Sequence, residues 1–322
     1  MNYALILSDG KPGHENQSKA LAEGLGLDFE IVPCSYASKG RKTLSYLLDA
    51  CRCTVDLTGI VAKAATVTKQ DSASRPVVLI GTGSNTFYSL KLLRRKLSLP
   101  CVAILTPRGY RFDDFDAILA PAFDLPPAKA NVISLPTNLT AARPAFYQAQ
   151  TAAFLERYTP QNKRAVGLIV GGKNSIADVS PEWLRTQLDA FFTATADCEH
   201  WVTTSRRTSP QAEAVIASYP FDYQLLFSHD HFNPIPAFVT RCERLFVTAE
   251  STGMLSEAVA IGSSYVEILD NLTTGTGKFA RFVEGLCREH YAHRFDGTLG
   301  TAHRKVNLAP LLETLRTQLH LS

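Results

Sequence analysis

The sequence predicts an α/β protein of two doubly wound Rossmann-like domains with a cleft between them. Short apolar runs such as 76–80 (PVVLI) are typical of strands buried in a parallel sheet, and they alternate with segments of helical period. This alternation restarts at residue 164, and 322 residues suffice for two domains of ordinary size. Polar, Gly-rich clusters follow most of the strands. Ligands of such sheets bind beyond the strands' carboxyl ends, so we expect the ligand site in the cleft.

The composition excludes several classes of protein. Hydrophobic residues make up 45% and charged residues 20% of the chain, and the net charge of +3 gives no reason to expect nucleic acid. The first residues lack the features of a signal peptide, and no apolar run is long enough to span a membrane. Seven scattered cysteines predict reduced thiols, and therefore a cytoplasmic protein. The basic amphipathic stretch 92–97 is either a solvated helix face or a peripheral contact with the inner face of the membrane.

The N-terminal domain is expected to span residues 1–143. Its first strand, 3–7, runs into the polar loop 8–18 (SDGKPGHENQS), and a helix follows over 17–24. The strand 76–80 leads into Gly81–Asn85 and a helix over 86–97. Further strands are predicted at 101–105 and 117–119.

A linker helix and loop over 144–163 should separate this domain from the C-terminal one, 164–322. The pattern predicts strands over 164–170, 200–204, 244–248 and 264–268, with a helix from about 251 to 261. The last helix of the chain can also pack back on the N-terminal domain.

Two clusters of the C-terminal domain could hold a phosphate. Gly171–Ser175 follows a strand and is expected to open a helix, whose first N–H groups and dipole favour an anion. The alternative is a tight turn that needs glycine only for its backbone angles. Arg206 and Arg207 follow another strand and offer fork-shaped cations for a phosphate, or they are solvated surface residues. Gly81–Asn85 of the N-terminal domain is a further candidate for a phosphate contact, and neither it nor Gly171–Ser175 has the spacing of a dinucleotide fingerprint.

The stretch 247–262 (VTAESTGMLSEAVAIG) resembles the nucleotide-sugar-binding helix of GT-B glycosyltransferases. In that family the helix N-terminus faces the diphosphate and the glutamate binds the ribose, so the resemblance assigns the ribose to Glu257. Ser251 can cap this helix. The donor-binding residues expected from all these clusters are Gly13, Gly171, Gly172, Lys173, Ser205, Arg206, Ser251, Thr252, Gly253, Met254, Ser256 and Glu257.

A second resemblance covers nearly the whole chain. The motifs DGKPGHENQS, GTGSN, GGKNS, TTSRRTS, NPIPAF and TAESTGMLSEA, in that order, are similar to the mitochondrial fission protein family of elongated-mitochondria type, in its bacterial, GT-B-like branch. There are two departures. Glu250 stands where the family usually has aspartate, and Gly262–Val266 replaces the usual Gly-Lys-Pro-Val.

These resemblances imply an inverting glycosyltransferase that moves a sugar from a nucleotide-sugar donor to an unknown acceptor, which is a protein, a glycan or a lipid-linked molecule. Such a reaction needs a base and groups that hold the leaving diphosphate. His14 is the candidate base, because imidazole has an ordinary pKa of about 6.5 and the loop is similar to the Gly-Gly-His loop of the enzyme that adds N-acetylglucosamine to lipid-linked peptidoglycan precursors. Asp9 and Glu15 are the rival bases. Asp9 could instead orient His14, Glu15 could cap the helix, and the loop could be purely structural.

No metal or other cofactor is expected, because the sequence has no Asp-x-Asp motif and the GT-B scheme does not require a metal. Two other functions fit the same motifs. A nucleotide-sugar 2-epimerase would use the same cleft without a separate acceptor, and a non-catalytic adaptor would keep the fold and bind a protein partner.

Overall fold

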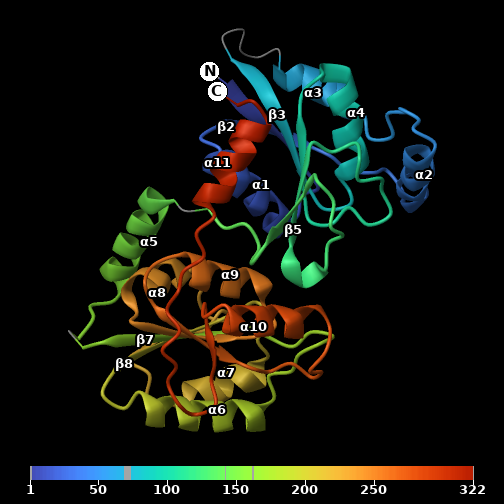
Figure 1. Cartoon of the computed structure of the whole chain (residues 1–322). Coiled ribbons are helices and arrows are strands. Elements are labelled where there is room, and N and C mark those ends of the chain that lie inside the picture. The colour runs from blue at the N-terminus through green and yellow to red at the C-terminus, as the bar shows by residue number, and fades with distance from the viewer. Residues whose placement is uncertain (1, 69–73, 142, 162, 322) are drawn as a thin grey trace. The chain divides into compact units, whose positions relative to one another are not determined.

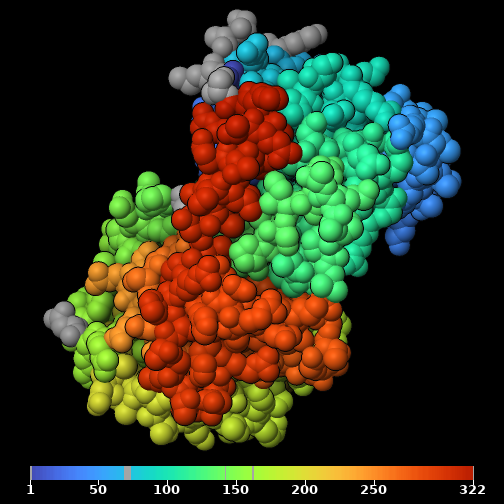
Figure 2. Space-filling view, in the orientation of Figure 1, coloured from blue at the N-terminus to red at the C-terminus, as the bar shows by residue number. Residues whose placement is uncertain are grey.

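The computed structural model describes residues 2–68, 74–141, 143–161 and 163–321. The chain divides into two compact units: unit 1 is Met1–Ala141 with Asn307–Ser322, and unit 2 is Ala142–Val306. The segment expected to be a linker, 144–163, thus belongs to unit 2. Asn162 of its predicted loop lies outside the described residues. The last helix, α11 (Ala309–Gln318), belongs to unit 1, and Figure 2 shows it in red on the surface of that unit.

Unit 1 is built on a six-stranded parallel sheet with the strand order β2-β1-β3-β4-β5-β6. Its strands are β1 (Asn2–Ser8), β2 (Asp28–Pro33), β3 (Arg75–Thr82), β4 (Cys101–Ile104), β5 (Ala117–Pro121) and β6 (Val132–Leu135). Its other helices are α1 (Pro12–Gly24), α2 (Lys39–Ala50), α3 (Ile60–Thr68) and α4 (Phe87–Leu97). The strand order reverses between β1 and β3, which is the point where doubly wound sheets bind their ligands.

Helices cover both faces of this sheet, as the alternation of side chains along β1 requires (Figure 1). Leu5 and Leu7 pack with residues of α3 and α4 on one face, and Ala4 and Ile6 pack with α1 and α11 on the other. The α11 side chain Leu315 is fully buried in this second cluster. The C-terminal helix therefore completes the core of unit 1.

Unit 2 contains a second six-stranded parallel sheet, in the order β12-β11-β10-β7-β8-β9. Its strands are β7 (Ala165–Val170), β8 (Glu199–Thr204), β9 (Tyr223–Leu225), β10 (Arg244–Thr248), β11 (Tyr265–Leu269) and β12 (His293–Arg294). Its helices are α5 (Pro144–Arg157), α6 (Pro181–Ala194), α7 (Pro210–Ala217), α8 (Ile235–Arg241), α9 (Thr252–Ala260) and α10 (Lys278–Arg288). This is the Rossmann strand order, and it reverses between β7 and β10.

Serine and proline fix where several of these helices begin. The hydroxyls of Ser180, Ser209 and Ser251 each accept a hydrogen bond from the backbone N–H three residues later, as N-caps do. Proline stands in the first turn of α1, α5, α6 and α7, where its missing N–H costs nothing. The cap of α9 was expected from the sequence, and the structure confirms it.

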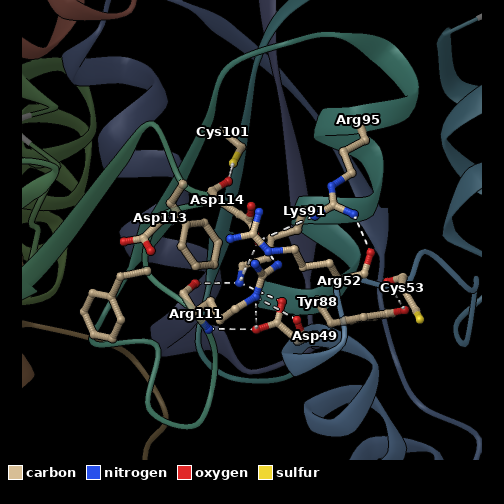
Figure 3. A network of polar contacts seen from close by, with 12 residues as sticks. Asp49, Arg52, Cys53, Tyr88, Lys91, Arg95, Cys101, Arg111, Asp113 and Asp114 are labelled. Carbon is tan, nitrogen blue, oxygen red and sulfur yellow. Dashed lines mark hydrogen bonds and ion pairs between the residues drawn. The ribbon is translucent and has the colours of Figure 1, made fainter.

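A buried ion network holds α2 and α4 of unit 1 to the loop after β4 (Figure 3). The Lys91 ammonium lies 2.7 Å from Asp49 Oδ1, and both side chains are almost fully buried. Asp49 Oδ2 also accepts the backbone N–H of Arg111 at 2.7 Å. Arg111 in turn forms an ion pair with Asp114. Each buried charge thus has an opposite charge beside it, which offsets the free-energy cost of removing that charge from water.

The basic stretch of α4 packs partly against the core of unit 1. Leu92 and Leu93 are buried in the core of unit 1. Arg94 forms a two-fold hydrogen bond to Asp116, with nitrogen–oxygen distances of 2.7 and 2.8 Å. Leu97, the third leucine of the stretch, is exposed, and the peripheral membrane contact stays an untested prediction. In the described part of the chain, no helix is long and apolar enough to cross a membrane.

Candidate functional site

The first cluster lies where the strand order of unit 1 reverses, beyond the carboxyl ends of β1 and β3. After β1 the chain turns at Gly10, whose φ of 78° is in the left-handed region that favours glycine. The sequence prediction placed residues 8–18 in a loop, and this is wrong for most of them, because α1 already begins at Pro12. A proline at the first helical position has the φ that a helix needs. His14 and Glu15 therefore lie on the first turn of α1.

His14 and Asp9 form a pair in this cluster. Nδ1 of His14 lies 3.1 Å from Asp9 Oδ1 and 3.2 Å from Oδ2, while the Asp9 side chain is only 1% exposed. The imidazole also packs so closely on Gly83 that a Cβ there would come within 2.5 Å of the ring. Since an ionised carboxylate can only accept, Nδ1 carries the proton and Nε2 is left as a proton acceptor. The geometry thus makes Asp9 the group that orients His14.

Two further contacts fix the Asp9 carboxylate. The Nδ2 of Asn85 donates to Oδ2 at 3.3 Å, and the Lys11 ammonium lies 3.3 Å from the same oxygen. Burial alone would raise the pKa of Asp9, but His14 and the amide and ammonium of Lys11 outweigh it, so the pKa lies below its ordinary value. Asp9 is therefore ionised at neutral pH and is a weak base.

Glu15 is held away from this pair by other partners. One carboxylate oxygen accepts from Ser8 Oγ at 2.9 Å, and the other lies 2.7 Å from the Lys19 ammonium. Hydrogen bonds from Lys19 and Ser8 lower the pKa of Glu15. Gly13 is exposed, and a Cβ there would meet no atom within 4 Å, so its surroundings are open to a ligand.

The second cluster lies where the strand order of unit 2 reverses, beyond β7 and β10. The backbone N–H of Gly171 donates to Thr248 Oγ1 at 2.8 Å, and that of Gly172 donates to Glu250 Oε1 at 2.8 Å. Asn271 Nδ2 donates to the other carboxylate oxygen at 2.9 Å. The buried Glu250 side chain thus links the segments that follow neighbouring strands by hydrogen bonds. Its approach is so close that a Cβ on Gly171 would lie 1.5 Å from Oε1.

These contacts correct two expectations about Gly171–Ser175. The turn does not open a helix, because α6 begins only at Pro181. The N–H groups of Gly171 and Gly172 are bonded within the protein, so neither is available to a phosphate. The glycines are needed for close packing, and at Gly172 a Cβ would come within 2.0 Å of the Arg207 carbonyl oxygen.

The N-terminus of α9 is partly open to solvent. Ser251 Oγ accepts the N–H of Met254 at 3.4 Å, which leaves the N-terminal turn ordered. Gly253 is exposed, and a Cβ there would meet no atom within 4 Å. Thr252 and Met254 are half-buried. Ser256 is fully buried and donates to the Thr252 carbonyl at 2.6 Å, so its predicted contact with a donor is wrong.

Glu257 lies on the second turn of α9 and is half-buried. The hydroxyl of Tyr147, on α5, donates to its Oε1 at 2.9 Å. Burial raises the pKa of the Glu257 carboxyl, and this hydrogen bond offsets only part of the effect. A carboxylate accepts several hydrogen bonds, so Oε2 can still accept from a ligand hydroxyl.

The remaining predicted donor residues lie on two turns. Arg206 is exposed, and no ion-pair partner for it is found in the described part of the chain. Ser205 caps its own turn, since its Oγ accepts the N–H of Arg207 at 3.2 Å. Lys173 is 73% exposed and lies 3.5 Å from Asp178. Among the described residues, no group of three or more His, Cys, Asp or Glu side chains could hold a metal ion.

The family model described as Mitochondrial fission ELM1 matches residues 12–317. The chain belongs to this family. The match confirms the resemblance drawn from the sequence motifs. A comparison with curated protein sequences finds no match.

Several solved structures are similar to this ELM1-family chain. The UDP-GlcNAc 2-epimerase from Methanocaldococcus jannaschii has a TM-score of 0.53 and 10% identity, over 98% of this chain and 99% of that one. The glycosyltransferase SnogD from Streptomyces nogalater has a TM-score of 0.49 and 14% identity, over 100% of this chain and 95% of that one. MurG from Acinetobacter baumannii has a TM-score of 0.47 and 14% identity, over 99% of this chain and 92% of that one. The two-domain GT-B-like α/β fold expected from the sequence is confirmed.

Sequence reasoning missed several partners of the site residues. Tyr147 lies 110 positions before Glu257 and carries no motif. Asn85 stands in the GTGSN motif, and its position after β3 was a usable signal for a contact with Asp9. The contact of Asn271 with Glu250 could not be predicted, because the sequence shows only that Asn271 follows the strand β11.

Proposed function

We propose that this chain is a glycosyltransferase that transfers a sugar from a nucleotide-sugar donor held by unit 2 to an acceptor activated by unit 1. The observation that carries the proposal is the His14–Asp9 pair at the carboxyl end of β1. A histidine whose Nδ1–H is held by a buried carboxylate presents Nε2 as a general base. Both rival bases have lowered pKa values, which makes them poorer proton acceptors.

The donor is assigned to the N-terminus of α9. Its helix dipole favours the diphosphate, and the exposed Arg206 adds a cation that can bind phosphate oxygens in pairs. Glu257, held by Tyr147, would accept the ribose hydroxyls through its second oxygen. The similar structure from Methanocaldococcus jannaschii is a UDP-GlcNAc 2-epimerase, so uridine diphosphate sugars are the first donors to test.

In the proposed reaction, the acceptor hydroxyl gives its proton to His14 Nε2 as its oxygen attacks the anomeric carbon. The bond from that carbon to the nucleoside diphosphate breaks, and the leaving oxygen takes the electron pair. The α9 dipole and Arg206 stabilise its developing charge. We propose that no metal is required.

The test is calorimetric titration of the wild type and Glu257→Ala with uridine, guanosine and cytidine diphosphate sugars. We expect one class of donor to bind the wild type, and Glu257→Ala to bind it about ten- to a hundredfold more weakly, since a hydrogen bond to a charged group is lost. No binding by the wild type would favour an adaptor. Turnover of the donor without any acceptor would favour an epimerase, and loss of turnover in EDTA would refute metal independence.

A further inference from the structure

A half-buried lysine stands beside the His14–Asp9 pair and plays no part in the function proposed above. Lys42, on α2, donates to the Ser84 carbonyl and, at 2.8 Å, to the Tyr110 hydroxyl. Ser84 follows Gly83, on which His14 packs, and precedes Asn85, which binds Asp9. The loop after β3 therefore joins Lys42 to the candidate catalytic pair.

Three tyrosines surround the Lys42 ammonium. Its nitrogen lies 5.1 Å from the ring centroids of Tyr36, Tyr46 and Tyr110. The Tyr36 hydroxyl is buried. We name these three tyrosines and Lys42 the lysine cage.

The cage lacks a counter-ion. In the part of the chain that the structure describes, no carboxylate forms an ion pair with Lys42, and the nearby Asp9 is already shared by His14 and Lys11. Burial and the nearby Lys11 together lower the pKa of Lys42 to about 8, and Cys34 and Asp9 only partly offset them. A half-buried ammonium is more stable with an opposite charge beside it, and an anionic ligand would supply the charge that no carboxylate provides here.

We propose that the lysine cage binds a phosphate group of the acceptor, with Lys42 and Lys11 as its cations. Two ammonium groups suit an anion with several acceptor oxygens, and lysine is a common phosphate ligand. The site would place the phosphate next to His14, so the hydroxyl that receives the sugar lies near it on the acceptor. The identity of the ligand as the acceptor rests on the proposed function, whereas the anion site does not.

The experiment reads Lys42 directly, by reductive methylation of the full-length protein and mass spectrometric mapping. Labelling is compared in inorganic phosphate, acetate and chloride at equal ionic strength. We expect phosphate to slow the labelling of Lys42 about tenfold, as one charge-assisted hydrogen bond or more implies, and acetate to slow it less. Lys39, exposed on the same helix, is the internal control and should label equally in all three. Equal labelling of Lys42 in phosphate and chloride would overturn the proposal, and equal protection by acetate would overturn the choice of phosphate.

Variants separate this inference from the proposed function. Lys42→Met should bind phosphate at least tenfold more weakly than the wild type, Lys42→Arg should stay within a few-fold, and both should bind the nucleotide-sugar donor normally. Circular dichroism melting of each variant checks its folding. Protection of Lys42 in a protein that binds no donor would refute the glycosyltransferase and leave the phosphate site standing. Donor binding by a protein in which phosphate does not protect Lys42 would refute the phosphate site and leave the glycosyltransferase standing.

Discussion

Replacing Asp9 with asparagine tests whether the buried carboxylate sets the protonation of His14. The carboxylate is 1% exposed and accepts from Nδ1 at 3.1 Å. An asparagine of the same shape can turn its NH₂ group toward Nδ1, which then becomes the acceptor and moves the imidazole proton to Nε2. The base would be blocked while the fold is kept. We expect the rate of sugar transfer to fall about 10²–10⁴-fold, the usual contribution of a positioned base.

The assay is single-turnover transfer at saturating donor, with donor affinity measured separately. Asp9→Asn should bind the donor as the wild type does, because the donor is assigned to unit 2. Asp113→Asn is the matched control, since Asp113 is a 72% exposed aspartate of unit 1 that pairs with Lys129. A rate for Asp9→Asn within a few-fold of the control would refute the reasoning and leave the pair a structural contact.

The same variant should change the pH dependence of stability. The folded-state pKa of Asp9 is lowered, so its stabilisation is present above the ordinary value of 3.8 and is lost as the pH falls through the lowered pKa. The free energy of unfolding of the wild type should therefore fall more steeply on acidification below about pH 4 than that of Asp9→Asn. Parallel urea titrations across this range measure the difference, and identical slopes would contradict the assigned pKa shift.

Three other variants probe the remaining contacts. Glu257→Gln should weaken donor binding without lowering the melting temperature at neutral pH, because burial raises the pKa of this carboxyl and its ionised form destabilises the fold above the ordinary carboxyl pKa; a clear loss of stability would show a structural role. Gly171→Ala should destabilise unit 2 by about 1–3 kcal/mol through a clash with a buried carboxylate, whereas Gly253→Ala, in open space, should not; equal melting temperatures would contradict this. Asp49→Ala should cost about 3–5 kcal/mol in urea unfolding because it strands a buried ammonium, and a loss below about 1 kcal/mol would mean that the network of Figure 3 is not a buried pair.

Local pattern predicted the fold class and the inner strands of both units, but it missed the edge strands β2, β6, β9 and β12. Continuous apolar runs such as 76–80 marked strands that helices cover on both faces, and β3 indeed spans Arg75–Thr82. Once the strands were predicted, the positions of their carboxyl ends and of the polar residues after them followed. Pattern failed at the start of α1, because Pro12 reads as a turn residue when its role as the first helical residue is not known.

The site was predictable only where one segment carries the chemistry. Asp9 and His14 are five positions apart, so their contact could be considered from the sequence. Gly171 looked like a phosphate turn because the sequence does not show that Glu250, 79 positions later, fills the space beside it. In the lysine cage, Tyr36 follows β2, Tyr110 follows β4, and Lys42 lies on α2. Only the tertiary fold brings these side chains together, so the sequence does not show the cage.

The most direct test of the central claim is single-turnover sugar transfer by His14→Ala, in a preparation whose folding and donor affinity match the wild type. The account predicts near-normal donor binding and transfer about 10²–10⁴-fold slower, because the acceptor hydroxyl would have no positioned group to take its proton. Transfer at the wild-type rate would contradict the account and assign His14 to the structure of α1 alone.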